Sequence, residues 1–168
     1  MKEQWSMSRI GGKKAQSNGS RFESDVLIAA ARREYKILDI PDGAKTFGRG
    51  KIIRMKSPFD FVAAKIFSQF RERFLFFDAK TTEKKKFAAA SINISQVENL
   101  SHFSLFKTAQ TGYVVNFDAQ GTVSFFTAEQ LSRAFVHRTS LAPDDGLILG
   151  NRFTMNFDKV FECEWEYQ

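Results

Sequence analysis

Cysteine and histidine are scarce in this chain of 168 residues, and no long apolar run is present. The single cysteine, Cys163, excludes an internal disulfide framework and a cysteine-rich zinc site, and it fits a reducing compartment. The two histidines, His102 and His137, have no partner pattern typical of zinc or of a catalytic triad. No stretch approaches the length of a membrane span, and the polar N-terminus has no signal-peptide core. We therefore expect a soluble, intracellular protein without membrane association.

Several common catalytic motifs are also missing. The sequence has no G-x-x-x-x-G-K-[ST] for nucleotide phosphates, no G-x-S-x-G and no H-E-x-x-H, which argues against the chemistries that these motifs serve. What the chain does have is apolar residues, 43% of the total, with 19 phenylalanines among them. This content predicts a globular protein, and the length favours one domain.

The net charge of +6 is unevenly placed and favours a polyanionic partner. Residues 1–21 and 41–56 are basic, whereas the C-terminal end is acidic. Ordinary solvated surface is the alternative interpretation of such basic runs. We predict a flexible basic arm over residues 1–19, a single domain over 20–168, and a short basic protrusion at about 41–56. The candidate contacts to nucleic-acid phosphates are Lys13, Lys14, Arg21, Lys45, Arg49, Lys51, Arg54, Lys84, Lys85 and Lys86.

Hydrophobic periodicity predicts helices alternating with strands, an α/β (α+β) domain with a central mixed sheet flanked by helices. Ser20 opens the first helix, whose apolar stripe consists of Phe22, Val26, Leu27 and Ala30. Thr127 is the expected N-cap of a short later helix. The other expected elements are a strand at 37–40, paired strands at 59–64 and 74–79 joined by a long turn at 65–73, a helix at 91–107, and a hairpin of 112–118 with 122–126. Residues 147–167 are rich in residues that favour β-strands, but their pattern does not predict a particular secondary structure.

The most informative pattern is an Asp next to one apolar segment and an Asp-x-Lys at the end of the next, namely Asp60, Asp78 and Lys80. In neighbouring strands, alternation sends Asp78 and Lys80 to one face, where Asp60 meets them across the pair. Two carboxylates and an ammonium suit a Mg²⁺ ion and an activated water, which together can cut a phosphodiester. The alternatives are aspartates that end strands and a plain surface ion pair.

Two further residues have competing interpretations. Glu23 completes the pattern Ser20-Arg21-Phe22-Glu23, which fits an S-x-x-E capping box, but it would also project from the first helix toward the carboxylates. Gln96 lies on the second long helix, where most glutamines are solvated.

The order of Glu23, Asp60, Asp78, Lys80 and Gln96 along the chain resembles that of the PD-(D/E)xK nuclease superfamily, with its restriction-endonuclease-like core. Within this superfamily the chain is most similar to the RecU-type Holliday junction resolvases and their phage relatives. The resemblance covers about residues 19–135. Two departures are Asp78, where the family usually has Glu, and Ser95, where it tends to have His. The family's stalk corresponds to about 41–56, which looks shorter. The stretches that carry the resemblance are Gly19–Glu23, Ser57–Phe61, Phe76–Lys80, Phe87–Leu100, and Gly112–Phe117 with Val123–Phe126.

The resemblance implies a Mg²⁺-dependent endonuclease, with Mn²⁺ as a substitute, that resolves four-way DNA junctions by paired nicks in recombination and repair. It implies metal binding by Asp60, Asp78, the Ala79 carbonyl and Glu23, with Lys80, Gln96 and these carboxylates as the catalytic set. It also implies a homodimer, in the cytoplasm of a bacterium or of a phage host. Two alternatives stay open: another nuclease of this superfamily, restriction- or repair-like, that cuts duplex DNA, and a non-catalytic junction-binding protein.

Overall fold

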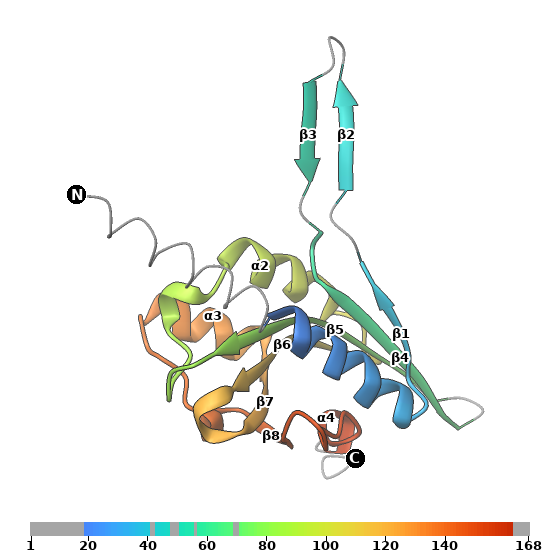
Figure 1. Ribbon diagram of the computed structural model, residues 1–168. Helices are drawn as coiled ribbons and strands as arrows, with labels where there is room; N and C mark the ends of the chain where they lie inside the picture. Colours follow the sequence, from blue (N-terminus) through green and yellow to red (C-terminus); the bar gives the residue numbers. More distant parts are fainter. Residues whose placement is uncertain (1–18, 41–42, 48–50, 56, 69–70, 163–168) are drawn as a thin grey trace.

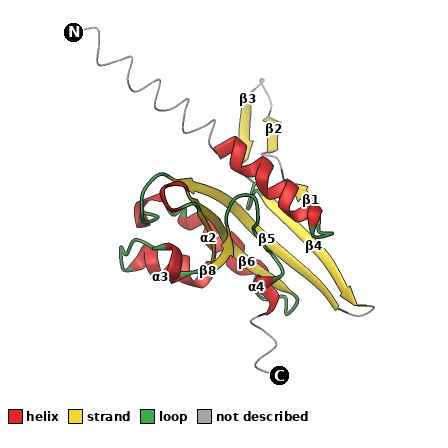
Figure 2. Ribbon diagram, turned by 60° about the horizontal axis from the view of Figure 1, so that its bottom comes forward, coloured by secondary structure: helices red, strands yellow, loops and turns green. Residues whose placement is uncertain are grey.

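The computed structural model describes residues 19–40, 43–47, 51–55, 57–68 and 71–162, and its centre is a six-stranded mixed β-sheet (Figures 1 and 2). Across the sheet the strands lie in the order β1 (Lys36–Asp39), β4 (Phe61–Ser68), β5 (Arg71–Thr82), β6 (Ala109–Phe117), β7 (Thr122–Thr127) and β8 (Leu147–Gly150). Neighbouring strands are antiparallel except β5 and β6, which run parallel and are connected through a helix.

Helices cover both faces of the sheet, as the sequence predicts for an α+β protein. A helix over residues 19–32 and the short α4 (Lys159–Glu162) pack on one face, and α2 (Ile94–Phe103) and α3 (Ala128–Val136) pack on the other. Single 3₁₀ turns occur at Ala89–Ser91, Asp118–Gln120 and Pro143–Asp145. Within the described residues, no helix is long and apolar enough to cross a membrane.

Side-chain alternation along the strands divides the core in two. On the first face, Phe22 and Val26 of the first helix are buried against Phe61 and Phe77. On the second, Val97 and Leu100 of α2 pack with residues of α3, β6 and β7. The predicted stripe of the first helix is confirmed, because its four apolar positions contribute to the first core.

Several local predictions are also confirmed. β6 and β7 form the predicted hairpin, and Gly121 closes its turn with φ 61°, a left-handed conformation that glycine adopts without strain. Thr127 is the N-cap of α3, where its side chain accepts from the Gln130 amide while the Gln130 side chain bonds back to Thr127.

The predicted turn over residues 65–73 is wrong. β4 continues to Ser68 and β5 begins at Arg71, with Lys65 paired opposite Arg73 and Ile66 opposite Glu72. Charged side chains suggested a loop, but a strand pairs through its backbone, and alternate side chains can face solvent without interrupting it.

The predicted helix at 91–107 is shorter than expected. Asn93 caps α2 by accepting from the Gln96 backbone amide, so the helix begins at Ile94, and it ends at Phe103. The preceding Ala89–Ser91 segment is a 3₁₀ turn. An Asn that competes for backbone hydrogen bonds explains the later start.

Between β1 and β4 the chain forms a separate antiparallel hairpin of β2 (Gly43–Phe47) and β3 (Lys51–Met55). Figure 1 shows it standing clear of the main sheet. This hairpin occupies the segment that the sequence analysis treats as a short basic protrusion. The predicted N-terminal arm lies outside the described residues, except for Gly19, which is already helical.

Candidate active site

Asp60, Asp78 and Lys80 come together where β4 begins and β5 ends. Phe61 and Phe77 are opposite each other in the antiparallel register, so Asp60 lies across from Asp78. The Asp60 backbone N–H donates to Asp78 Oδ1 at 2.8 Å. One carboxylate therefore fixes the strand end that carries the other, as expected if the Asp…Asp-x-Lys pattern lies on adjacent strands.

Lys80 is shared between the two carboxylates. Its Nζ lies 3.8 Å from Asp60 Oδ2 and 3.7 Å from Asp78 Oδ2. Both separations exceed those of a strong charge-assisted hydrogen bond. Lys80 therefore balances the local charge without closing either oxygen to a further ligand.

Asp78 is the most perturbed group of the site. It is 0% exposed, and its Oδ2 is buried without a hydrogen-bond donor among the described residues. Burial raises the pKa of Asp78 to about 7, with Asp60 adding to the rise and Lys80 opposing it. A buried carboxylate oxygen without a donor is costly unless a cation or water meets it.

Gln96 and Tyr113 form the wall of the site behind Lys80. Lys80 Nζ donates to Gln96 Oε1 at 3.5 Å, and the Tyr113 hydroxyl lies 3.4 Å from the same oxygen and 3.3 Å from the Asn93 carbonyl. Lys80 Nζ also lies 5.3 Å from the centre of the buried Tyr113 ring. Two donors at Oε1 fix the orientation of the Gln96 amide and leave its nitrogen as the donor.

Tyr113 is a site residue that the sequence analysis did not identify. It lies opposite Asp78 in the parallel β5–β6 register. Burial raises the pKa of Tyr113, and the charge of Asp78 adds to that rise, so the phenol stays neutral as a hydrogen-bond donor. The signal that could have found it is this register, and strands joined by a long connection do not reveal their register in the sequence.

Glu23 faces the site from the first helix. Glu23 is exposed, but its partial burial raises the pKa of its carboxyl group. The charges of Asp60 and Asp39 raise this pKa further, and the charge of Lys80 lowers it. The capping box, one of the two interpretations of Glu23, is not formed, because Ser20 is already inside the helix and its carbonyl accepts from the Ser24 hydroxyl. Glu23 is therefore free of a capping role.

The oxygen atoms of the site are suitable ligands for a hard divalent cation. Asp60 and Asp78 offer carboxylate oxygens, and the donorless Oδ2 of Asp78 is suited to a positive charge. Across the described ranges, no group of three or more His, Cys, Asp or Glu side chains is arranged to hold a metal ion. Glu23 is thus beside the Asp60–Asp78 pair and does not complete a three-carboxylate centre.

The predicted DNA contacts are only partly described. Arg21 is exposed near the start of the first helix, and Lys84, Lys85 and Lys86 are exposed just beyond β5. This placement puts four cations on the elements that flank the site. Lys13, Lys14 and Arg49 lie outside the described residues, and the structure does not describe the side chains of Lys45, Lys51 and Arg54 on β2 and β3.

Comparison with solved structures relates the fold to that of a Holliday junction resolvase. The chain superimposes on the structure of Hjc, a Holliday junction resolvase from the archaeal hyperthermophile Archaeoglobus fulgidus, with a TM-score of 0.51. The match has 20% sequence identity and covers 77% of this chain and 95% of that chain. The predicted restriction-endonuclease-like fold is thereby confirmed. No protein-family model matches the sequence, and a search among curated proteins found no match.

Proposed function

We propose that this protein is a metal-dependent endonuclease that cuts four-way DNA junctions. The observation that carries the proposal is the convergence of Asp60, Asp78 and Lys80, with Nζ 3.8 and 3.7 Å from the two carboxylates. The fold adds support, since a protein described as a Holliday junction resolvase has a similar fold. Fold alone does not define an activity, so the site has to carry the argument.

Asp60, Asp78 and the Ala79 carbonyl would hold a Mg²⁺ ion, for which Mn²⁺ can substitute, and Glu23 would contribute negative charge from the first helix. When bound, such an ion lowers the pKa of a coordinated water and offsets charge on the phosphate. The raised pKa of Asp78 supports this assignment, because a cation favours the ionised form that burial disfavours.

The chain's own groups complete the chemistry. Lys80 orients the attacking water or stabilises the negative charge that develops on the phosphate. Gln96 holds Lys80 through Oε1, and its amide nitrogen would be the donor to a phosphate oxygen. Tyr113 keeps both side chains in place through its ring and its hydroxyl. Attack in line with the leaving oxygen leaves a 5′-phosphate and a 3′-hydroxyl.

The DNA partner is proposed from charge and from the hairpin. Arg21 and Lys84 to Lys86 would contact phosphates, giving affinity that falls steeply with salt concentration. The β2–β3 hairpin lies between β1 and Asp60, which is where the RecU-type resemblance expects a stalk that enters the junction. A homodimer would bring two sites to one junction, one for each nick.

The test is incubation of the full chain with a labelled four-way junction and with matching linear duplex, in Mg²⁺ or EDTA. Paired, Mg²⁺-dependent nicks confined to the junction support the proposal. Equal cutting of both substrates would keep the nuclease site and discard junction specificity. Binding without cutting would overturn the catalytic assignment.

Matched variants separate the site from the rest of the molecule. Asp60→Asn removes a charge from the site with little change in shape, and Asp144→Asn makes the same change at an exposed position in the Pro143–Asp145 turn. We expect only Asp60→Asn to abolish cleavage, with junction binding retained in both variants.

A further inference from the structure

The first helix has acidic residues on two opposite flanks in its first described turns. Glu23 lies close enough to Asp60 and Asp39 for their charges to raise its pKa. Asp25 is two positions further on, and residues at this spacing point to opposite sides of a helix. Asp25 pairs instead with Arg152, which lies in the turn after β8. The helix is thus held on one flank while it presents Glu23 on the other.

Arg152 holds Asp25 with two nitrogen atoms. Its Nε and Nη2 donate to Asp25 Oδ2 at 2.8 and 2.5 Å. The two side chains are 25% and 21% exposed, so solvent screens this pair less than a pair at an open surface. Because the guanidinium is planar and bonds through two atoms, the contact fixes the orientation of Asp25 as well as its distance.

The third nitrogen of Arg152 connects this pair to the sheet. Nη1 lies 3.7 Å from Asp118 Oδ1, which also accepts from the Asn116 amide at 2.6 Å. Asn116 is fully buried on β6, one position beyond the partner of Lys80 in the β5–β6 register. Its Oδ1 is buried without a hydrogen-bond partner among the described residues, so the bond to Asp118 orients this side chain. Arg152 therefore joins the first helix to the strand beside Lys80.

The turn that carries Arg152 is itself fixed by hydrogen bonds. Asn151 Oδ1 accepts from the backbone amides of Phe153 and Thr154 at 2.9 and 3.0 Å. Thr154 Oγ1 in turn accepts from the Asn151 amide at 3.3 Å. Met155, which follows the turn, is buried in the first core. Such side-chain bonds set the backbone of a turn, so the Arg152 side chain extends from a fixed position.

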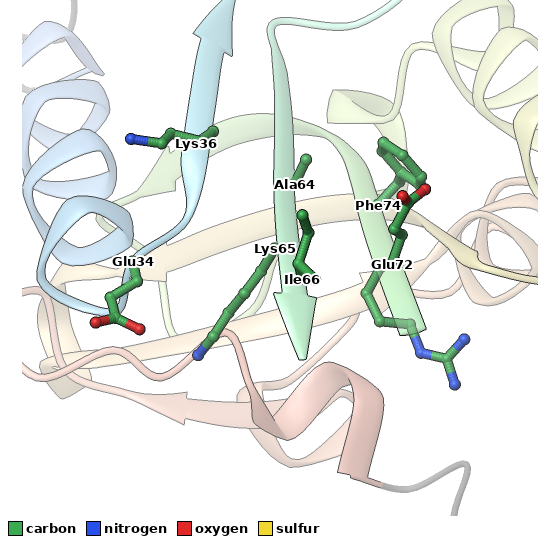
Figure 3. Close-up of a pocket in the computed structure, with 8 residues that line it drawn as sticks. Glu34, Lys36, Ala64, Lys65, Ile66, Glu72 and Phe74 are labelled. Carbon is green, nitrogen blue, oxygen red and sulfur yellow. The ribbon is translucent and has the colours of Figure 1, made fainter. Parts of the chain in front are cut away.

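The far end of the first helix is held separately, next to a pocket of about 430 Å³ (Figure 3). Figure 3 shows Lys65 extending from β4 toward the C-terminal segment, where it bonds to Asp158 at 2.9 Å. Asp158 also lies 3.5 Å from Arg33, just after the helix. Loss of Arg152 should therefore loosen the start of the helix and leave its end in place.

We propose that Arg152 is a positioning residue that holds Glu23 over the metal site through Asp25. Burial of Phe22 on the sheet is non-directional, whereas the two-point ion pair sets the rotation of the helix about its axis. The inference rests on the proposed function, because Glu23 has a role only if the site binds a cation. Arg152 lies outside residues 19–135, so the resemblance to nucleases does not imply this role.

The first experiment measures binding of Mn²⁺ to the full chain without DNA, by electron paramagnetic resonance, in matched arginine variants. Arg152→Gln removes the guanidinium, and Arg133→Gln makes the same change at an exposed pair with Glu129. We expect Arg152→Gln to weaken Mn²⁺ binding about tenfold, the lower range for loss of a supporting contact, and Arg133→Gln to leave it unchanged. Asp25→Asn breaks the same pair from the helix and should act like Arg152→Gln. Equal affinities in the two arginine variants would overturn the proposal.

A double variant separates positioning from a general loss of structure. Glu23→Gln alone should weaken Mn²⁺ binding. If Arg152 acts through Glu23, then Arg152→Gln should cause no further loss in the Glu23→Gln background. An equal loss of affinity in both backgrounds would overturn the positioning role.

Hydrogen exchange of the metal-free chain tests the anchor directly. Amides of residues 20–26 should exchange faster in Arg152→Gln than in Arg133→Gln, while retained protection in β5 and β6 shows that the variant folds. Unchanged exchange in this segment would overturn the proposal. The two ideas fail separately: a parent that binds no Mn²⁺ rejects the proposed metal site and the role of Arg152 with it, whereas Mn²⁺ binding that Arg152→Gln leaves unchanged rejects only the positioning role.

Discussion

Two clusters in this molecule contain the same kinds of residue in a similar arrangement. In the candidate active site, Lys80 lies 5.3 Å from the ring centre of Tyr113 and next to two aspartates. The second group, which we call the Asp158 cluster, consists of Arg33, Tyr35, Lys65 and Asp158. Here Lys65 Nζ lies 5.2 Å from the Tyr35 ring centre.

The two clusters differ in how fully their carboxylates are paired. Asp158 accepts from the Tyr35 hydroxyl at 2.8 Å and from Lys65 Nζ at 2.9 Å, with Arg33 at 3.5 Å. In the active site the shortest ammonium–carboxylate distance is 3.7 Å, and Asp78 Oδ2 has no donor within the described part of the chain.

This difference is the one expected between a structural cluster and the proposed catalytic one. The Asp158 cluster joins the end of the first helix, β4 and the C-terminal segment, and its polar groups are satisfied by one another. The candidate active site has instead an unsatisfied buried oxygen, which the cation of the proposed function would meet. Residue types alone would not distinguish the two.

The largest expected contrast is in cleavage. Asp60→Asn should slow junction cutting about 1000-fold or more, since a metal site supplies several kcal/mol to the transition state and each 1.36 kcal/mol is tenfold. Asp158→Asn should leave the rate of the bound complex nearly unchanged. Single-turnover cleavage of a labelled junction measures both, and similar losses in the two variants would remove the distinction between the clusters.

The next contrast is in stability. Asp158→Ala removes the partner of Tyr35 and Lys65 and should lower the free energy of unfolding by about 1–2 kcal/mol, less than for a fully buried pair because the charged groups are partly exposed. Asp144→Ala, an exposed control, should cost little. Urea denaturation measures both values. A small loss at Asp158 would mean that its ion pairs contribute little.

The pH dependence of stability should reveal the raised pKa of Asp78. Because the folded-state pKa of Asp78 is raised to about 7, this group costs stability as pH rises from about 4 through 7. Asp78→Asn should remove that fall and stabilise the metal-free protein at pH 8 by roughly 2 kcal/mol, less than the full value at about 1.4 kcal/mol per pKa unit because Lys80 loses a counter-charge.

Denaturation in EDTA at pH 5 and pH 8 measures this effect. We expect the variant and the parent to differ more at pH 8 than at pH 5. If the difference in unfolding free energy between Asp78→Asn and the parent were the same at pH 5 and at pH 8, the Asp78 pKa would not be raised.

The smallest expected effect concerns the two tyrosines. Tyr113→Phe keeps the ring beneath Lys80 and removes the hydroxyl at Gln96, so cleavage should fall by no more than about tenfold, the lower range for a supporting contact. Tyr35→Phe should lower stability and leave the cleavage rate unchanged. The rate at saturating Mg²⁺, compared with the unfolding free energy, separates the two roles.

The part of the site predicted from the sequence depends on local geometry. Alternation placed Asp78 and Lys80 on one face, and a neighbouring strand brought Asp60 opposite them. The apolar stripe of the first helix and the Thr127 cap were predicted for the same reason, since each pattern lies within a single element.

The features that could not be predicted depend on distant pairing. Tyr113 joins the site only through the parallel register of β5 and β6, which are separated by α2. The Asp158 cluster unites residues more than 90 positions apart. For Glu23 the sequence left two interpretations open: the capping box is not formed, because the helix already includes Gly19, and the projection toward the carboxylates agrees with the structure.

The contact between the Asp60 backbone and the Asp78 side chain also bears on how this protein can change over evolution. Because the Asp60 backbone is hydrogen-bonded to Asp78 at 2.8 Å, the length of the side chain at position 78 determines where the backbone of residue 60 lies. Replacing Asp78 with the longer Glu would displace both carboxylates, so this exchange is not conservative here. Among relatives, positions 60 and 78 should therefore covary together with the chain segment that leads into β4.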